Sequence, residues 1–203
     1  MNGKIGLEEH FALPETLQDS AGFLAESVWG ELSKRLMDIH EYRLREMDKN
    51  GMEMMILSLN APAIQAIADK KRANELAIKA NDFLAEQVAK RPDRFQGFAA
   101  LPMQDPDMAT KELIRCMKDL GFKGSLVNGF SQVDQPENLV YYDAPQYAAF
   151  WQTLSDPDIA SAVLELEPAQ YTVPLDDEYM DEIASAFGQV VDAKSPFTAG
   201  HSE

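Results

Sequence analysis

The sequence predicts an α/β fold in which helices alternate with the strands of a parallel sheet. Along residues 1–154, short apolar runs typical of strands alternate with longer segments whose apolar residues recur at helical spacing. The joints between these segments are short, which is typical of parallel β–α units. Polar residues also follow several of the strand-like runs, and parallel α/β folds build their sites at strand carboxyl ends.

The first two predicted strands enclose one helical segment. The stretch GKIGLEEHF at 3–11 begins with alternating apolar residues and runs into two glutamates and a histidine. A helix is expected around 36–48, and the letters KNG end it because Gly51 suits the left-handed position after a helix. The apolar run EMMILSLN at 53–60 predicts the second strand.

Two further strands follow, each preceded by a helix. A helix is expected at about 71–90, where apolar residues share one face. The stretch RFQGFAALP at 94–102 predicts the third strand. Asp105 and Pro106 then have the types expected of a helix cap and a first-turn proline. The stretch KGSLVNG at 123–129 predicts the fourth strand.

Composition and charge indicate which partners and which cellular compartment to expect. The chain has 203 residues and a formal net charge of −16, so nucleic acid and anionic membrane are not expected partners. No run of about 18 apolar residues and no signal-peptide core are present, so no membrane span is expected. Cys116 is the single cysteine, which fits a reducing cytoplasm.

Glu8 and His10 close the first predicted strand. Residues two apart in a strand point to the same side, so these two side chains are expected to lie together. A carboxylate and an imidazole so placed can hold a divalent metal. A solvated strand end is the commoner meaning of such a pair. The chain has only two other histidines, His40 in a charged, helix-like segment that is expected at the surface, and His201 near the end.

Four segments carry a family resemblance: GKIGLEEHFALPETLQDSAGF, MILSLNAPAIQAI, AKRPDRFQGFAALPMQDPD and GFKGSLVNGFSQ. They resemble the gamma-resorcylate (2,6-dihydroxybenzoate) decarboxylases of the amidohydrolase superfamily, and the resemblance covers about residues 1–154. It implies the N-terminal half of a metal-dependent, TIM-like (β/α)8 barrel, with about four βα units.

The resemblance also implies a site. Glu8 and His10 match the first metal-ligand pair of the family, so a divalent cation, Zn²⁺ or Mn²⁺, is the expected cofactor. Phe23 matches a position that lines a small aromatic carboxylic acid, and a homo-oligomer, or association through the open barrel edge, is expected. The family's proton-donating acid comes from later strands, so no catalytic residue is assigned. Three further pocket candidates end predicted strands: Ser58, Asn60 and Asn128.

Residues 155–203 differ from the preceding region and are expected to be foreign to the barrel. They hold 11 acidic and one basic residue, a net charge of −10. Apolar spacing predicts a helix at about 177–193. The last 25 or so residues resemble the opening of HD-type phosphohydrolase domains, including the HD-GYP group, although the HD dipeptide is absent. There His201 matches a histidine near the metal site, which makes it an alternative metal ligand.

Three functions follow from these observations. The first is a metal-dependent, non-oxidative hydroxybenzoate decarboxylase, expected to be truncated and impaired because no fifth strand ending in histidine follows residue 154. The second is a non-catalytic fragment, or a fusion or interaction module. The third is a fragment of an HD-type phosphohydrolase.

Overall fold

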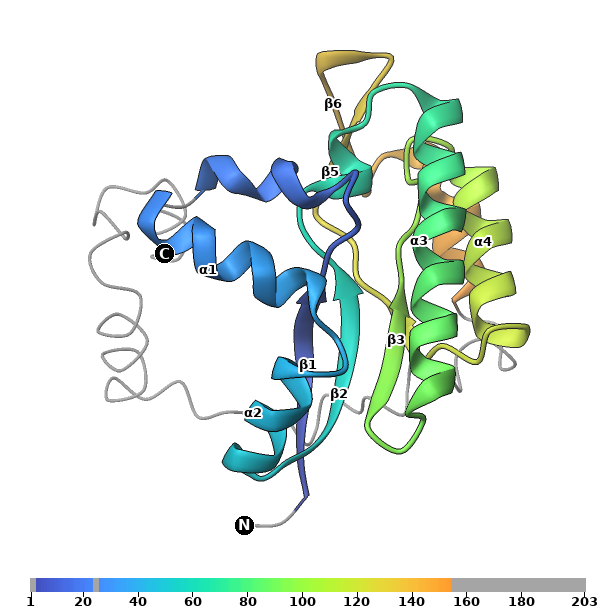
Figure 1. The fold of residues 1–203 in the computed structure, drawn as a ribbon. Coiled ribbons are helices and arrows are strands. Elements are labelled where there is room, and N and C mark those ends of the chain that lie inside the picture. The colour runs from blue at the N-terminus through green and yellow to red at the C-terminus, as the bar shows by residue number, and fades with distance from the viewer. Residues whose placement is uncertain (1–2, 24–25, 155–203) are drawn as a thin grey trace, which may run out of the picture. The chain divides into compact units, whose positions relative to one another are not determined.

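Four parallel strands form one sheet in a computed structural model that describes residues 3–23 and 26–154 (Figure 1). The strands lie in the order β1-β2-β3-β4 and all adjacent pairs are parallel, as the sequence predicts. Their bounds are β1 Lys4–Phe11, β2 Met52–Leu59, β3 Phe95–Ala99 and β4 Gly124–Ser125. The helix expected at 177–193 and His201 lie outside the described residues.

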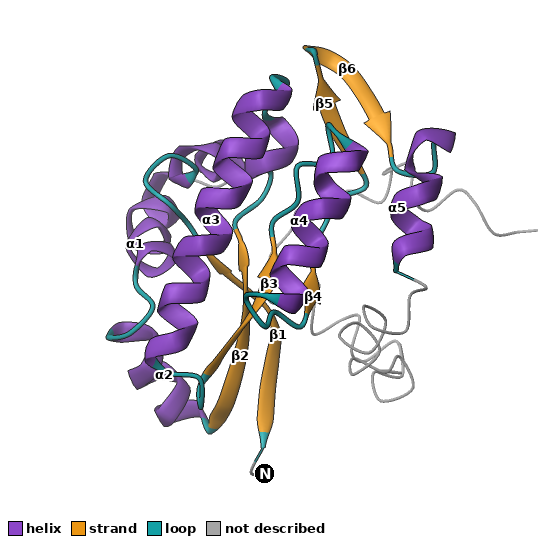
Figure 2. Ribbon diagram, turned by 90° about the vertical axis from the view of Figure 1, so that its right-hand side faces the viewer, coloured by secondary structure: helices purple, strands orange, loops and turns teal. Residues whose placement is uncertain are grey.

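Helices connect these strands, and α3 and α4 run side by side along one face of the sheet (Figure 2). The α-helices are α1 Glu26–Met37, α2 Tyr42–Asn50, α3 Lys70–Lys90, α4 Pro106–Lys118 and α5 Ala148–Thr153. Short 3-10 helices are η1 Leu17–Phe23, η2 Ala63–Ala66 and η3 Pro145–Tyr147. None of the described helices has the length and hydropathy needed to cross a membrane.

The predicted start of α4 and the predicted end of α2 are confirmed. Asp105 caps α4 by accepting a hydrogen bond from the backbone N–H of Met108. Asp69, which was not predicted as a cap, caps α3 in the same way through the backbone N–H of Arg72. Gly51 follows α2 with φ of 66°, in the left-handed region where a residue without Cβ is favoured.

Two features differ from the sequence prediction. The single helix expected at 36–48 is instead the end of α1 and most of α2, because the Asp38 carboxylate accepts a hydrogen bond from the Arg43 backbone N–H (2.9 Å) in the first turn of α2. An antiparallel hairpin of β5 (Phe130–Val133) and β6 (Gln135–Tyr141), joined at Asp134, was not predicted. The fourth strand is only two residues long.

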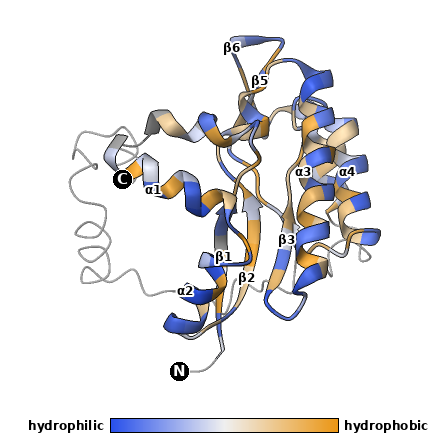
Figure 3. Cartoon of the chain, in the orientation of Figure 1, coloured by the Kyte–Doolittle hydropathy of each residue, from blue (hydrophilic) through white to orange (hydrophobic). Residues whose placement is uncertain are grey.

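The core fills the space between the sheet and the two helices α3 and α4. In Figure 3 the hydrophobic colouring runs along β2 and in stripes along α3 and α4. Leu57 of β2 and Phe95 of β3 have no exposed surface, and Leu84 of α3 is 1% exposed. The opposite face of the sheet carries His10 of β1 and Ser58 of β2, which are partners in register, so the sheet separates the core from the candidate site.

Gly97 in β3 allows this close packing of helix on sheet. A Cβ added there would lie 2.8 Å from a ring carbon of Phe122 and 3.0 Å from a methyl carbon of Leu84. We therefore expect Gly97→Ala to lower the free energy of unfolding by about 1–3 kcal/mol through overpacking. Gly30→Ala is the matched control, since a Cβ at this position of α1 meets nothing within 4 Å and should gain helix propensity. Urea unfolding of both variants tests this, and equal stability would contradict it.

Candidate functional site at the carboxyl ends of the strands

A β-bulge shapes the carboxyl half of β1. From Gly6 to Glu9, β1 advances three residues while β2 advances two, from Met55 to Leu57. The extra residue bends the strand and re-aims side chains, which is common beside active sites. Glu8 lies in the bulge, so the simple alternation rule does not by itself fix where its side chain points. The convergence of Glu8 with His10 therefore stays a prediction.

His10 follows the bulge, pairs with Ser58 in register, and is held on two sides. Its ring Nδ1 lies 2.9 Å from Ser58 Oγ, and Ser58 is 2% exposed. Its backbone carbonyl accepts a hydrogen bond from Arg43 Nη2 at 2.6 Å. No described residue hydrogen-bonds the other ring nitrogen, Nε2. That nitrogen is the group that fits a metal ligand.

Arg43 joins α2 to the edge strand β1. Its side chain is 11% exposed, and its guanidinium also lies 3.7 Å from Glu9 Oε2. Burial lowers the pKa of Arg43, and the nearby carboxylates of Glu9 and Asp38 oppose that shift. Glu9 is therefore engaged with α2. Sequence reasoning missed Arg43, because nothing in its helical segment indicates that its side chain reaches the backbone of a strand 33 residues earlier.

A cavity of about 640 Å³ lies between α1, α2 and the carboxyl half of β1. Its volume falls in the range of small-molecule sites. Apolar groups from Leu32, Leu36 and Met55 line it together with the polar groups of His10 and Arg43. The carboxylates of Glu9 and Glu46 also line it. The cavity can therefore accept an apolar ring beside an imidazole and a guanidinium that is paired with Glu9.

Ser58, Asn60 and Asn128 lie together, around a much smaller space. They line a cavity of about 10 Å³ with Gln65, at the carboxyl ends of β2 and β4. That volume holds about one water molecule. Asn128 donates to Gln65 Oε1 at 3.2 Å. Direct contact of these three residues with a substrate stays a prediction.

Asn60 locks the loop that follows β1. Its Nδ2 donates to Thr16 O (2.8 Å) and to Ser20 Oγ (2.8 Å), and its Oδ1 accepts from Thr16 Oγ1 (2.7 Å). Asn60 is 3% exposed and Thr16 is fully buried. All three polar positions of the amide are thus used within the protein. The contact with residues 16–20 was not predicted, because it joins segments 40 residues apart.

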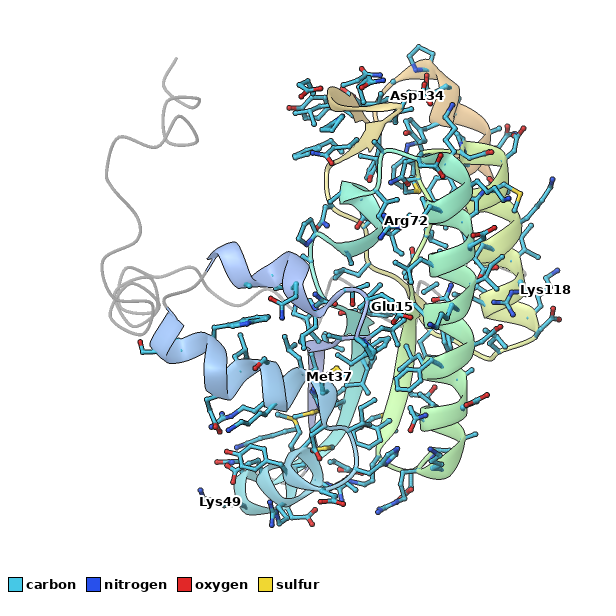
Figure 4. The ribbon with its side chains drawn as sticks, turned by 45° about the horizontal axis from the view of Figure 1, so that its top comes forward. Glu15, Met37, Lys49, Arg72, Lys118 and Asp134 are labelled. Atoms are coloured by element: carbon cyan, nitrogen blue, oxygen red, sulfur yellow. The ribbon has the colours of Figure 1, made fainter. Side chains whose placement is uncertain are left out.

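The loop after β1 is also tied to α3. Figure 4 shows Glu15 near this helix, where its carboxylate forms an ion pair with Lys79. The hydrogen bond from Lys79 holds the pKa of Glu15 below its usual value. The loop leads into η1, which ends at Phe23. The side chain of Phe23 is outside the described part, so its contact with a substrate stays a prediction.

The expected surface position of His40 is wrong. His40 is half-buried rather than at the surface: its ring meets the ring of Phe95 edge-on at 5.7 Å, and its Nε2 lies 3.2 Å from Gln87 Oε1. This places His40 on the helix side of the sheet, away from His10. Within the described residues, no three His, Cys, Asp or Glu side chains form a metal-binding group.

Successive parallel β–α units with a polar cluster at the strand carboxyl ends define an α/β protein of the barrel type, with its site where barrel enzymes build theirs. A family model described as "Amidohydrolase" matches residues 10–191. The chain belongs to the amidohydrolase family.

Similar proteins agree with this assignment. The chain is 64% identical over 159 residues to a gamma-resorcylate decarboxylase of Polaromonas sp. JS666, a match that covers 78% of this chain and 49% of the relative. It also resembles a crystal structure of a dihydroxybenzoic acid decarboxylase from that organism with bound manganese and the inhibitor 2-nitroresorcinol. That match has a TM-score of 0.74 and 65% identity, and it covers 76% of this chain and 46% of the other. The predicted family and the partial barrel fold are confirmed. The chain spans about half the length of the curated relatives it matches.

A shorter similarity points to a second enzyme. The chain is 56% identical over 54 residues to a 3'3'-cGAMP-specific phosphodiesterase 3 of Vibrio cholerae, covering 27% of this chain and 12% of the relative. This relative is a phosphodiesterase, and the carboxyl-terminal segment of the chain resembles the opening of phosphohydrolase domains. A match to 12% of an enzyme does not assign its activity.

Proposed function

We propose that the protein is a metal-dependent, non-oxidative decarboxylase of a hydroxybenzoate of the 2,6-dihydroxybenzoate type. The observation that carries this proposal is the His10 ring at the carboxyl end of β1, held through Nδ1 with Nε2 left for a ligand. The relatives named above, a gamma-resorcylate decarboxylase and a dihydroxybenzoic acid decarboxylase, support the choice of reaction and substrate class.

Glu8 and His10 are the residues proposed to hold the metal. Manganese is the first choice because the related crystal structure contains it, and Zn²⁺ is the alternative. A divalent cation supplies a Lewis acid that can bind the carboxylate and the adjacent phenol oxygen of the substrate. The protein's own residues orient the ring of His10 and present an apolar wall. Proton delivery to the ring carbon is not assigned to any described residue.

The substrate is proposed to be a small aromatic carboxylic acid that enters the cavity beside β1. Phe23 at the end of η1 is the proposed ring contact. Arg43 also lines the cavity, but its charge is already paired with Glu9, so it is not assigned to the substrate carboxylate. The lone cysteine, Cys116, is buried and burial raises the pKa of its thiol, so it is an inert core residue that fits a cytoplasmic protein.

An interaction module is the second candidate function, and the hairpin favours it. Large apolar side chains are exposed on the hairpin and on α5, with Phe130, Leu139, Tyr141 and Trp151 between 39% and 56% exposed. Clusters of this kind mark association surfaces. Self-association through this surface or through the open edge of the sheet is compatible with either function.

Release of CO₂ from 2,6-dihydroxybenzoate, measured with and without Mn²⁺, tests the decarboxylase proposal. We expect slow, metal-dependent release and weak metal binding, because His10 and Glu8 are the two ligands proposed and the described residues hold no group of three. Glu8→Ala and His10→Ala should each abolish release, whereas His40→Gln should retain it, since His40 contacts the core side of the sheet. Folded protein with neither Mn²⁺ uptake nor CO₂ release would favour the interaction module. Rapid turnover lost in both alanine variants would show that further ligands are present.

A further inference from the structure

We propose that Ser58 is a positioning residue that fixes the tautomer of His10, so that Nε2 faces the metal with a free lone pair. The inference rests on the proposed function, because it concerns how the metal ligand is prepared. It also gives Ser58 a role different from the substrate contact that the sequence predicts.

The register of the sheet brings the two side chains together. His10 and Ser58 are direct partners across the parallel pair of β1 and β2, on the face opposite the helix-facing core. The Ser58 hydroxyl lies 2.9 Å from His10 Nδ1. Ser58 as a whole is 2% exposed. A substrate therefore has little access to this hydroxyl.

The chemistry of imidazole decides what this contact does. A neutral ring carries one N–H, and a metal needs the nitrogen that lacks it. If Nδ1–H donates to Ser58 Oγ, the lone pair is on Nε2, which has no hydrogen-bond partner among the described residues. Outer partners of this kind orient metal-binding histidines and set their tautomer.

The Ser58 hydroxyl needs a hydrogen-bond acceptor other than His10 Nδ1, and the structure has room for one. Ser58 also lines the cavity of about 10 Å³ that it shares with Gln65 and Asn128, which is room for about one water molecule. A water there can accept the Ser58 hydroxyl proton and leave the oxygen lone pairs to accept from His10. The opposite arrangement, with the hydroxyl donating to Nδ1, would place the ring proton on Nε2 and block the metal.

The backbone of His10 is fixed as well. Arg43 Nη2, from α2, donates to the His10 carbonyl at 2.6 Å. The backbone is thus held from α2 and the ring from β2. A ligand whose rotamer is restricted in this way is organised before the metal arrives.

Nitrogen NMR of ring-labelled histidine in the metal-free protein tests the proposal, at a pH where the ring is neutral. The chain has three histidines, and His10→Gln identifies the His10 signals. We expect the wild type to carry the proton on Nδ1. Ser58→Ala should shift the proton toward Nε2 and weaken Mn²⁺ binding by about 10–100-fold.

Ser131→Ala is the matched control. Ser131 is also a buried serine, and its hydroxyl lies 2.7 Å from Tyr142 Oη in the hairpin region, apart from His10. This variant should change neither the tautomer nor Mn²⁺ affinity. A wild-type proton on Nε2, or a Ser58→Ala variant with unchanged tautomer and affinity, would overturn the proposal. A wild type with the Nδ1 proton and no Mn²⁺ uptake would support the role of Ser58 in setting the tautomer and overturn the decarboxylase proposal instead.

Discussion

Replacing Arg115 by methionine is expected to lower the free energy of unfolding by about 3 kcal/mol, because it strands a buried carboxylate. Glu112 is 4% exposed and accepts two hydrogen bonds from Arg115, at 2.8 Å from Nε and 2.7 Å from Nη2. The same pairing raises the pKa of Arg115. Without the guanidinium, the buried carboxylate of Glu112 would have only neutral hydrogen-bond partners.

The Glu112 network also holds the chain beyond β3. Asn81 of α3 donates to Glu112 Oε1 at 2.7 Å and to the Ala100 carbonyl at 2.9 Å. Its own carbonyl accepts from the Ala100 backbone N–H at 2.8 Å. A single buried cluster therefore connects α3, α4 and the segment that leaves the third strand. Loss of Arg115 should loosen this connection as well as destabilise the charge.

Urea unfolding at pH 7 measures the effect, and two controls separate its cause. Arg115→Met combined with Glu112→Leu should recover part of the loss, because the buried charge is removed with its partner. Arg91→Met breaks the exposed ion pair with Asp93 and should change stability little. A single Arg115→Met variant as stable as the wild type would contradict the expectation.

Local sequence patterns predicted the four parallel strands because each strand has an apolar pattern within its own segment. The apolar run at 53–60 becomes β2, buried over its last four residues, and the spacing at 71–90 becomes α3. The hairpin has no such local cause. Most of β6 is exposed, and the hairpin is tied to the rest of the protein by the hydrogen bond from Asp134 N to Ala68 O (2.9 Å), which joins segments far apart in sequence.

The site was predictable in its residue types and not in its geometry. His10 stands out because it closes the first predicted strand, and the family resemblance adds its role. The bulge before it exists only in the pairing of β1 with β2. The partner of its ring, Ser58, follows from that register, and Arg43 reaches its carbonyl from a separate helix. Such contacts depend on tertiary packing, which single-residue patterns do not contain.

Asn60→Asp is expected to destabilise the loop after β1 by about 3 kcal/mol at pH 7, because it buries a carboxylate without a cationic partner. The amide donates to Thr16 O and to Ser20 Oγ, both at 2.8 Å. A carboxylate oxygen in that place would face the Thr16 carbonyl with no proton between them. The new charge would also sit at a position that is 3% exposed.

The pH dependence of Asn60→Asp gives this expectation a second test. Burial raises the pKa of the new carboxyl in the folded state above its unfolded value of about 3.9. The folded state then binds the proton more tightly, so the deficit relative to the wild type is full above the folded-state pKa and shrinks as pH falls through it. Urea unfolding from pH 7 to pH 4 measures this. Asn128→Asp is the matched control, since Asn128 is only half-buried and makes one bond of 3.2 Å to Gln65, and its deficit should be smaller. A loss of stability for Asn60→Asp that is small, or that grows as the pH falls, would show that the Asn60 amide does not lock the loop. Asn60 would then be available for contact with a substrate.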